Sequence, residues 1–185
     1  MHRGMALILG GWLLGAILLA LTAAENFWMI DRLVGSEGHP SFHEKVVALP
    51  PGEAREMLRY LSSELNRFWF QVWGWAEACF AVALLAMAAR LKHRKLVIGF
   101  ALMLAAVAVM NFYLTPRIIE VGRALDFVPR EPPPPNLAEF GRLHAAYSIL
   151  DLAKLLVGFW MAIALLRLPT ESPKEAKPFP KKTLA

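Results

Sequence analysis

Three ionisable residues lie within stretches of sequence that are otherwise almost wholly apolar. Glu77 lies in the stretch 68–89, and Asp151 and Lys154 lie in the stretch 145–166. An ionisable side chain inside a membrane is costly and usually faces the interior of a helix bundle, where it finds a partner. Asp151 and Lys154 are three positions apart, so a helix places them on one face. We therefore predict an intramembrane polar cluster of Glu77, Asp151 and Lys154.

This cluster has two interpretations. Carboxylate and ammonium groups inside a membrane can form a proton or ion relay, which would make the chain a small proton, ion or solute transport protein. The same groups can form an internal clasp that fixes how the helices pack. A relay normally has more members than Glu77, Asp151 and Lys154, so the pattern favours the clasp and leaves transport as an alternative.

A second set of polar residues stands at the outer ends of the apolar stretches, where all four helix ends should meet at one level. Such a ring could form a shallow binding site. An ordinary interfacial hydrogen-bond network is the more common use of such residues and is the favoured interpretation. The predicted outer-interface polar cluster comprises Asn26, Glu64, Asn66, Arg67, Asn111, Arg117, His144 and Ser148.

The histidine of this cluster, His144, begins a polar stripe that continues through Ser148 and Asp151. A histidine that faces a helix bundle can be an axial haem ligand, so a haem-linked membrane redox protein is a further alternative. Haem held between helices usually needs a second strong ligand, and no other histidine lies in an apolar stretch. We expect no catalytic residue, cofactor or metal ligand. The single cysteine, Cys79, is expected to be a small buried hydrophobe.

Four apolar stretches must position these residues. Hydrophobic residues make up 57% of the chain and charged residues only 19%. The stretches 5–24, 68–89, 96–115 and 145–166 each have the length, about 20 residues, that a helix needs to cross a bilayer core. The first is too long for the core of a signal peptide, so we expect it to be retained. Since spanning segments must satisfy their own backbone hydrogen bonds, we predict an all-α fold, a four-helix transmembrane bundle in a single domain, 1–168.

Helical periodicity continues beyond three of these stretches. Leucine spacing predicts that the second helix runs from Glu53 to Ala89, and that the third continues past Pro116 with a kink there. Asn136, with Glu139 three residues later, is typical of a capping box that opens the fourth helix. Helices 2–4 should therefore extend beyond the membrane on the outer side. The remaining segments are an outer loop at 35–52, a Pro-rich outer connector at 129–135 and a disordered basic cytoplasmic tail at 169–185.

The charges that flank the apolar stretches predict how the chain sits in the membrane. Lys and Arg dominate the segments 90–95 and 167–182, whereas acidic residues balance the basic ones in the outer segments. Cytoplasmic flanks carry the excess of Lys and Arg. We expect both termini to be cytoplasmic and the protein to lie in the plasma membrane, the inner membrane of a bacterium. The net charge of +5 is too small and too segregated to indicate nucleic-acid binding.

Two short motifs resemble a known family. The segment Asn111–Arg117 reads Asn-Phe-Tyr-Leu-Thr-Pro-Arg, and Phe140–Ser148, which contains Leu-His, leads into Asp151. They resemble the transmembrane protein 205-like family, a four-helix membrane domain of unknown function with Thr-Pro-Arg at the end of its third helix. Two features depart from that pattern, the long outer segment Gly35–Arg67 and Asp151, where asparagine would be expected. The resemblance implies the four-helix architecture and the positions of polar residues, and it implies no activity.

The function that these features favour is that of an accessory or interaction component of the membrane rather than an enzyme. The helix that projects from Glu53 and the Pro-rich connector 129–135 would supply surface outside the bilayer. The expected partners are the lipid bilayer and, through the outer helices, either another protein or a second copy of the chain.

Overall fold

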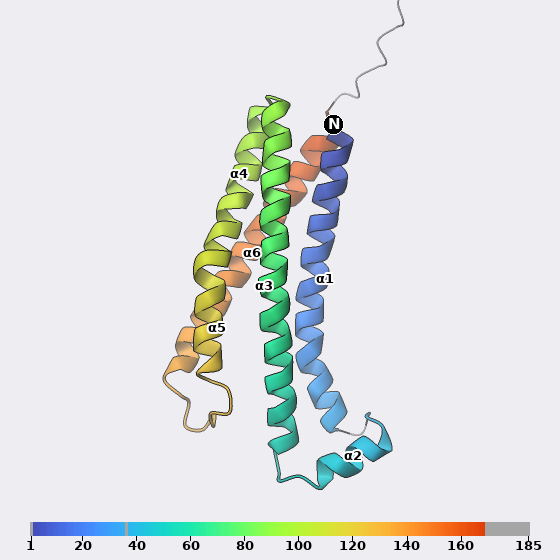
Figure 1. Ribbon diagram of the computed structural model, residues 1–185, viewed down its shortest axis with the longest axis vertical. Helices are drawn as coiled ribbons and strands as arrows, with labels where there is room; N and C mark the ends of the chain where they lie inside the picture. Colours follow the sequence, from blue (N-terminus) through green and yellow to red (C-terminus); the bar gives the residue numbers. More distant parts are fainter. Residues whose placement is uncertain (1, 36, 169–185) are drawn as a thin grey trace, which may run out of the picture.

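The computed structural model describes residues 2–35 and 37–168, and this part of the chain is all-α (Figure 1). The predicted basic tail, 169–185, lies outside the described residues. The helices are α1 (His2–Val34), α2 (Pro40–Val47), α3 (Glu53–Arg90), α4 (Arg94–Val109), the π-helical segment η1 (Met110–Leu114), α5 (Thr115–Arg123) and α6 (Asn136–Leu166).

The long helices pack side by side in one bundle. α3 packs against α1 and α4, and α6 packs against the same two helices, so α3 and α6 occupy opposite corners. The start of α1, the α3–α4 turn and the end of α6 lie at one end of the bundle, which we call the terminal end. α2 and the segment between α5 and α6 lie at the other, which we call the α2 end. In Figure 1, α6 runs obliquely from α5 at the α2 end to α1 at the terminal end.

Four helices qualify as membrane spans. α1, α3, the continuous helix Arg94–Arg123 and α6 are each long and apolar enough, by length and composition, to cross a membrane. This confirms the predicted all-α fold with four candidate spans packed together. The second of them begins at Glu53, where the leucine spacing placed its start, and ends at Arg90.

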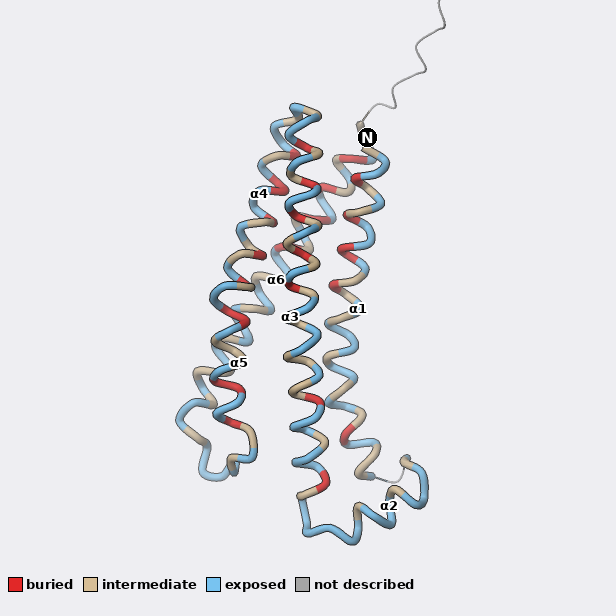
Figure 2. Tube along the Cα trace, in the orientation of Figure 1, coloured by how far each residue is buried: buried red, intermediate tan, exposed pale blue. Residues whose placement is uncertain are grey.

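The tightly packed core lies in the half of the bundle near the terminal end (Figure 2). Many large apolar side chains elsewhere are exposed, including Trp28 at 67% and Phe112 at 71%, and such a surface suits contact with lipid tails. Cys79 is also exposed, so the expectation of a buried cysteine was wrong. Lipid is as apolar as a protein core, so an apolar side chain in a span has little drive toward the interior. The core consists of Met5, Leu9, Trp12, Leu13, Ala81, Leu84, Ala88, Leu96, Phe100, Met103, Val107, Met161 and Leu165.

α6 approaches its two neighbours closely at two glycines. A Cβ atom on Gly99 of α4 would lie 2.2 Å from Sδ of Met161, and one on Gly158 of α6 would lie 2.6 Å from Cδ2 of Leu13. Both distances are far shorter than a normal contact between heavy atoms. Small residues let membrane helices approach closely enough for dispersion contacts to hold them together. The packing of α6 against α4 and α1 therefore depends on these glycines.

The third span contains a π-helical segment, η1, just before its proline. The backbone N–H of Thr115 donates to the carbonyl of Met110, five residues back, which is the π pattern. Pro116 follows directly and has no N–H to contribute to the helix ladder. The predicted continuation past Pro116 is present as α5, and the irregular hydrogen bonding is taken up by the wider turn of η1.

The predicted outer loop, 35–52, contains a helix that the sequence analysis did not anticipate. α2 begins at Pro40, whose fixed φ suits a first helical turn. His39 caps it, because the N–H of Ser41 donates to His39 Nδ1 at 3.2 Å. A helix of this length carries too short a periodic pattern to stand out from a loop in the sequence.

The predicted capping box at the start of α6 does not form. Asn136 is the first helical residue, and Pro135 before it already has helical angles (φ −58°, ψ −34°), so no side chain caps the helix. Glu139 instead accepts a hydrogen bond from Nη2 of Arg117 at 2.7 Å. Both partners of this bond are charged, whereas in a capping box the carboxylate accepts from a neutral backbone N–H, so Arg117 is the stronger partner.

Candidate functional site

The three ionisable residues of the predicted intramembrane cluster lie together in the structure. Glu77 of α3 and Lys154 of α6 form an ion pair in which each side chain is only 1% exposed. Lys154 Nζ also lies 2.8 Å from Oδ1 of Asp151, one turn earlier on α6. Trp12 of α1 completes the cluster, since its Nε1 donates to Glu77 Oε1 at 2.8 Å. The ammonium group of Lys154 lies 6.0 Å from the centroid of the Trp12 ring, within reach of a cation–π interaction.

The ion pair crosses the centre of the bundle, because α3 and α6 stand at opposite corners. Removing one partner of a buried pair leaves an uncompensated charge and costs about 3–5 kcal/mol. The arrangement therefore acts as a clasp between the two helices that are not neighbours. Asp151 is the most accessible member, with its side chain 22% exposed. Neither of the two cavities described below, in the part of the chain that the structure covers, is lined by Glu77, Asp151 or Lys154.

The predicted outer-interface cluster is divided into separate contacts rather than closed into one ring. The first contact joins α1 to α3. Asn26 Nδ2 donates to Asn66 Oδ1 at 2.7 Å, and Asn66 Nδ2 donates to the carbonyl of Ala23 at 3.1 Å. Ser62 adds a hydrogen bond to the carbonyl of Asn26 at 3.1 Å. These side chains pin the two helices together just beyond the core.

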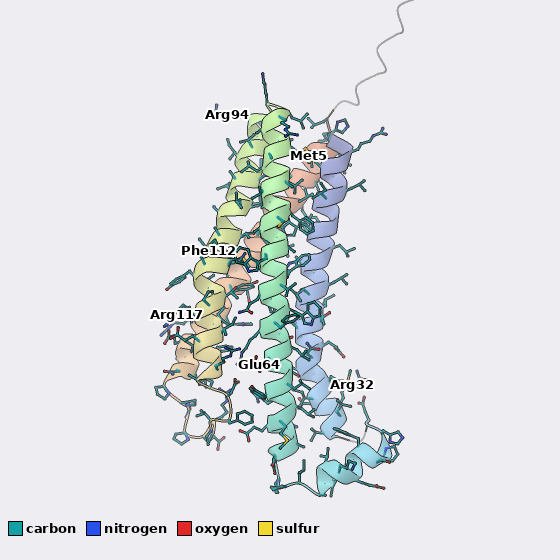
Figure 3. All side chains as sticks on the ribbon, in the orientation of Figure 1. Met5, Arg32, Glu64, Arg94, Phe112 and Arg117 are labelled. Atoms are coloured by element: carbon teal, nitrogen blue, oxygen red, sulfur yellow. The ribbon has the colours of Figure 1, made fainter. Side chains whose placement is uncertain are left out.

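The second contact is an ionic network centred on Arg67, and it includes Glu64, which is labelled in Figure 3. The guanidinium of Arg67 binds both oxygens of Asp126, at 2.7 and 2.9 Å, and Glu64 at 2.6 Å. Arg123 Nη2 reaches Glu64 at 3.2 Å from α5. Hydrogen bonds from Arg123 and then Arg67 lower the pKa of Glu64 below its ordinary value. Gly122 leaves room for the network, since a Cβ atom there would lie 3.3 Å from Arg67 Nη2.

The third contact, at Arg117, joins α5 to α6 (Figure 3). Its guanidinium donates to Glu120 at 2.6 Å and to Glu139 at 2.7 Å. His144 and Ser148 join none of these contacts. Both are exposed on α6, and Ser148 Oγ donates to the His144 carbonyl at 3.0 Å. His144 therefore does not face the bundle, which is the position that the haem alternative requires.

The remaining member, Asn111, bonds to the backbone of a neighbouring span. Its Nδ2 donates to the carbonyl of Gly74 at 2.7 Å. A Cβ atom on Gly74 would lie 2.2 Å from Asn111 Oδ1, so only glycine permits this approach. The contact fixes η1 against α3 at one height. No sequence pattern links these two positions, which lie in different apolar stretches.

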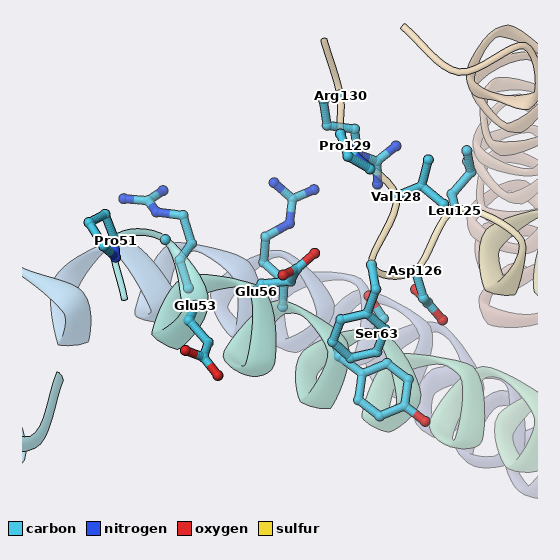
Figure 4. A pocket seen from close by; sticks show the side chains of 14 residues that line it. Pro51, Glu53, Glu56, Ser63, Leu125, Asp126, Val128, Pro129 and Arg130 are labelled. Carbon is cyan, nitrogen blue, oxygen red and sulfur yellow. The ribbon is translucent and has the colours of Figure 1, made fainter. Parts of the chain in front are cut away.

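A cavity of about 520 Å³ lies at the α2 end, between the first turns of α3 and the segment that follows α5 (Figure 4). The rings of Tyr60 and Phe127 meet there, with centroids 5.0 Å apart. Phe127 is 56% exposed and has a positive φ of 57°, a left-handed conformation that side chains rarely adopt. The cavity is lined by Pro51, Gly52, Glu53, Arg55, Glu56, Arg59, Tyr60, Ser63, Leu125, Asp126, Phe127, Val128, Pro129 and Arg130.

A smaller cavity of about 300 Å³ lies between α3 and the start of α5. Thr115 is 8% exposed, and its Oγ1 has no hydrogen-bond partner among the described residues. The sequence places Thr115 at the outer end of its apolar stretch and does not indicate that its hydroxyl is buried without a partner. The cavity is lined by Gln71, Trp75, Asn111, Thr115 and Pro116.

Comparisons with known proteins add no relative. No family model, no curated protein and no solved structure matches the chain. The resemblance to the transmembrane protein 205-like family therefore stays a prediction from the two short motifs. What stands is an all-α chain with four helices able to span a membrane, packed into one bundle.

Proposed function

We propose that the chain is an accessory protein of the plasma membrane that binds a protein partner at its α2 end, on the outer side. The proposed orientation keeps both termini cytoplasmic and places the first turns of α3 beyond the bilayer. The partner surface is the interaction patch, which we define as Arg59, Tyr60, Phe127 and Arg130. The family resemblance is compatible with this role and supplies no activity of its own.

The observation that carries the proposal is the conformation of Phe127. A residue other than glycine in the left-handed region costs of order 1–3 kcal/mol, and such strain concentrates at functional sites. Phe127 bears this cost at φ 57° while its ring stays 56% exposed. Within the described chain the ring packs against Tyr60, and more than half of its surface stays open to a partner. Contact with a partner would offset the cost.

The residues around Phe127 are of the types that dominate binding energy in protein interfaces. Tyrosine and arginine are enriched among the few residues that carry most of the affinity. Arg59 and Arg130 line the same cavity, and within residues 2–35 and 37–168 neither forms an ion pair. Glu53 and Glu56 balance their charge, and Figure 4 places them opposite Arg130. This lining favours a partner of mixed charge that presents an apolar side chain.

The rest of the bundle supports an accessory role over the two alternatives. Transport through the intramembrane cluster would require space beside Glu77, whose side chain is 1% exposed and packs against Lys154 and Trp12. Haem ligation by His144 would require it to face the bundle, whereas it is exposed and stacks on Phe140 with ring centroids 5.9 Å apart.

Site-specific photo-crosslinking in native membranes tests the proposal. A photoreactive residue at position 127 should give one discrete adduct, and the same residue at the exposed position Phe159 on α6 should not. Phe127→Gly should remove the interaction in mild detergent with little change in thermal stability, because the relief of the positive φ offsets the lost ring contact with Tyr60. An adduct of twice the chain's mass would identify the partner as a second copy. A monomer with no adduct at position 127 would contradict the proposal.

A further inference from the structure

The smaller cavity holds a buried polar group that the bundle leaves unused. We call its lining residues, Gln71, Trp75, Asn111, Thr115 and Pro116, the π-bulge niche. Thr115 is only 8% exposed, yet its hydroxyl has no hydrogen-bond partner among the described residues. Buried hydroxyls are nearly always hydrogen-bonded, so an unpaired hydroxyl that lines a cavity indicates a site where a ligand can bind.

The backbone around this hydroxyl is irregular. The N–H of Thr115 is committed to the carbonyl of Met110 in the π turn, and Pro116 supplies no N–H at the next position. The irregular turn holds the Thr115 side chain in the niche beside Asn111, whose amide is fixed by the Gly74 carbonyl at 2.7 Å. π-helical segments within α-helices are often found at functional sites.

The chemistry of the lining defines the class of ligand. None of the five niche residues is ionisable, and four of them, Gln71, Trp75, Asn111 and Thr115, carry hydrogen-bonding side-chain groups. Trp75 and Phe112 pack edge to face beside the niche, with ring centroids 5.9 Å apart, and are 61% and 71% exposed. Thr115 ends the apolar stretch 96–115, which places the niche at the depth of the lipid ester groups.

We propose that the π-bulge niche binds the uncharged, carbonyl-bearing head of a lipid-soluble molecule whose apolar tail stays in the bilayer. The Thr115 hydroxyl donates to a carbonyl of the head, and the rings of Trp75 and Phe112 flank it. This chemistry has two sources, the ester carbonyls of a diacylglycerol-type lipid and the ring carbonyls of a quinone. The site is independent of the interaction patch at the α2 end.

The test uses the full chain in nanodiscs of ether-linked phosphatidylcholine, which has no ester carbonyl to compete. Dioctanoylglycerol and a decyl benzoquinone serve as probes, and native mass spectrometry measures the bound fraction. At least one probe should bind saturably at one molecule per chain, and the probe that binds identifies the source. Thr115→Val should weaken that binding about tenfold, the equivalent of about 1.4 kcal/mol, and Thr115→Ser should retain it.

The controls separate binding from folding. Thr115→Val should not lower the unfolding temperature without probe, because its hydroxyl has no partner to lose. Ser148→Ala, which removes an exposed hydroxyl on α6, should leave binding unchanged. Failure of both probes to bind, or equal binding by the Thr115→Val and wild-type chains, would overturn the proposal.

Discussion

At the scale of single residues, the ion pair between Glu77 and Lys154 has the largest expected effect. Lys154→Met should lower the free energy of unfolding by about 3–5 kcal/mol, because it leaves the buried carboxylate of Glu77 without a counter-ion. Glu77→Gln should cost less, because Lys154 keeps its ion pair with Asp151. Glu77→Gln together with Lys154→Met should recover part of the loss caused by Lys154→Met, since the glutamine oxygen still accepts from Trp12. The recovery is only partial, because the carboxylate of Asp151, which is 22% exposed, loses its partner. Unfolding in a denaturing-detergent titration measures all three variants. A double variant less stable than either single one would rule out the clasp.

The same residues show what a sequence can predict at this scale. Glu77 and Lys154 stood out because a charge inside an apolar stretch nearly always has a partner there. Trp12 did not, because tryptophan is common in membrane spans and its N–H donates to whatever acceptor the fold brings near. Phe127 gave no signal either, since a positive φ is a property of the folded chain and not of a phenylalanine in a sequence.

At the scale of the helices, the close contact between α3 and η1 depends on Gly74. Gly74→Ala should lower the free energy of unfolding by about 1–3 kcal/mol, the usual cost of overpacking, because its Cβ would meet the Asn111 side chain at 2.2 Å. Gly10→Ala in α1 is the matched control. A Cβ atom there has nothing within 4 Å, so this change should be neutral or slightly stabilising. Equal effects of the two substitutions would contradict the described contact.

The four long helices could be predicted, and their irregular parts could not. Length and hydropathy sufficed for the spans because a bilayer imposes both. α2 is too short to show a convincing period. η1 arises from Pro116 together with the contacts of its neighbours, so Pro116 alone indicated a kink without saying how the backbone would absorb it. The capping box at Asn136 failed because Glu139 has a stronger partner in Arg117.

At the scale of the whole molecule, hydropathy did not indicate which two helices lie at opposite corners of the bundle. The outer-interface residues were expected to converge because all four spans end at one level. Most of them instead bond to a neighbouring helix, as Asn26 of α1 does with Asn66 of α3 and Arg117 of α5 with Glu139 of α6. His144 and Ser148 join no such contact among the described residues. Because α6 runs obliquely toward α5 at the α2 end (Figure 1), the polar residues there form separate contacts between pairs of helices rather than one ring.

The proposed orientation of the whole molecule can be tested by labelling. In a Cys79→Ala background, Pro51→Cys should react with an impermeant thiol reagent added to intact cells, because it lies at the α2 end. Lys92→Cys, in the turn between α3 and α4, should react only after the cells are opened. Quantified labelling on gels distinguishes the two. The reverse pattern would invert the orientation and move the interaction patch to the cytoplasm.

The diagonal position of the ion pair has a consequence for biosynthesis. Glu77 and Lys154 are 77 residues apart in the chain, and synthesis at about 5–20 residues per second separates their emergence by roughly 4–15 s. During that interval the first three spans hold a carboxyl group whose counter-ion has not yet been made. A chain truncated before α6 keeps this carboxyl group without its counter-ion, so it should be recognised as incomplete and degraded.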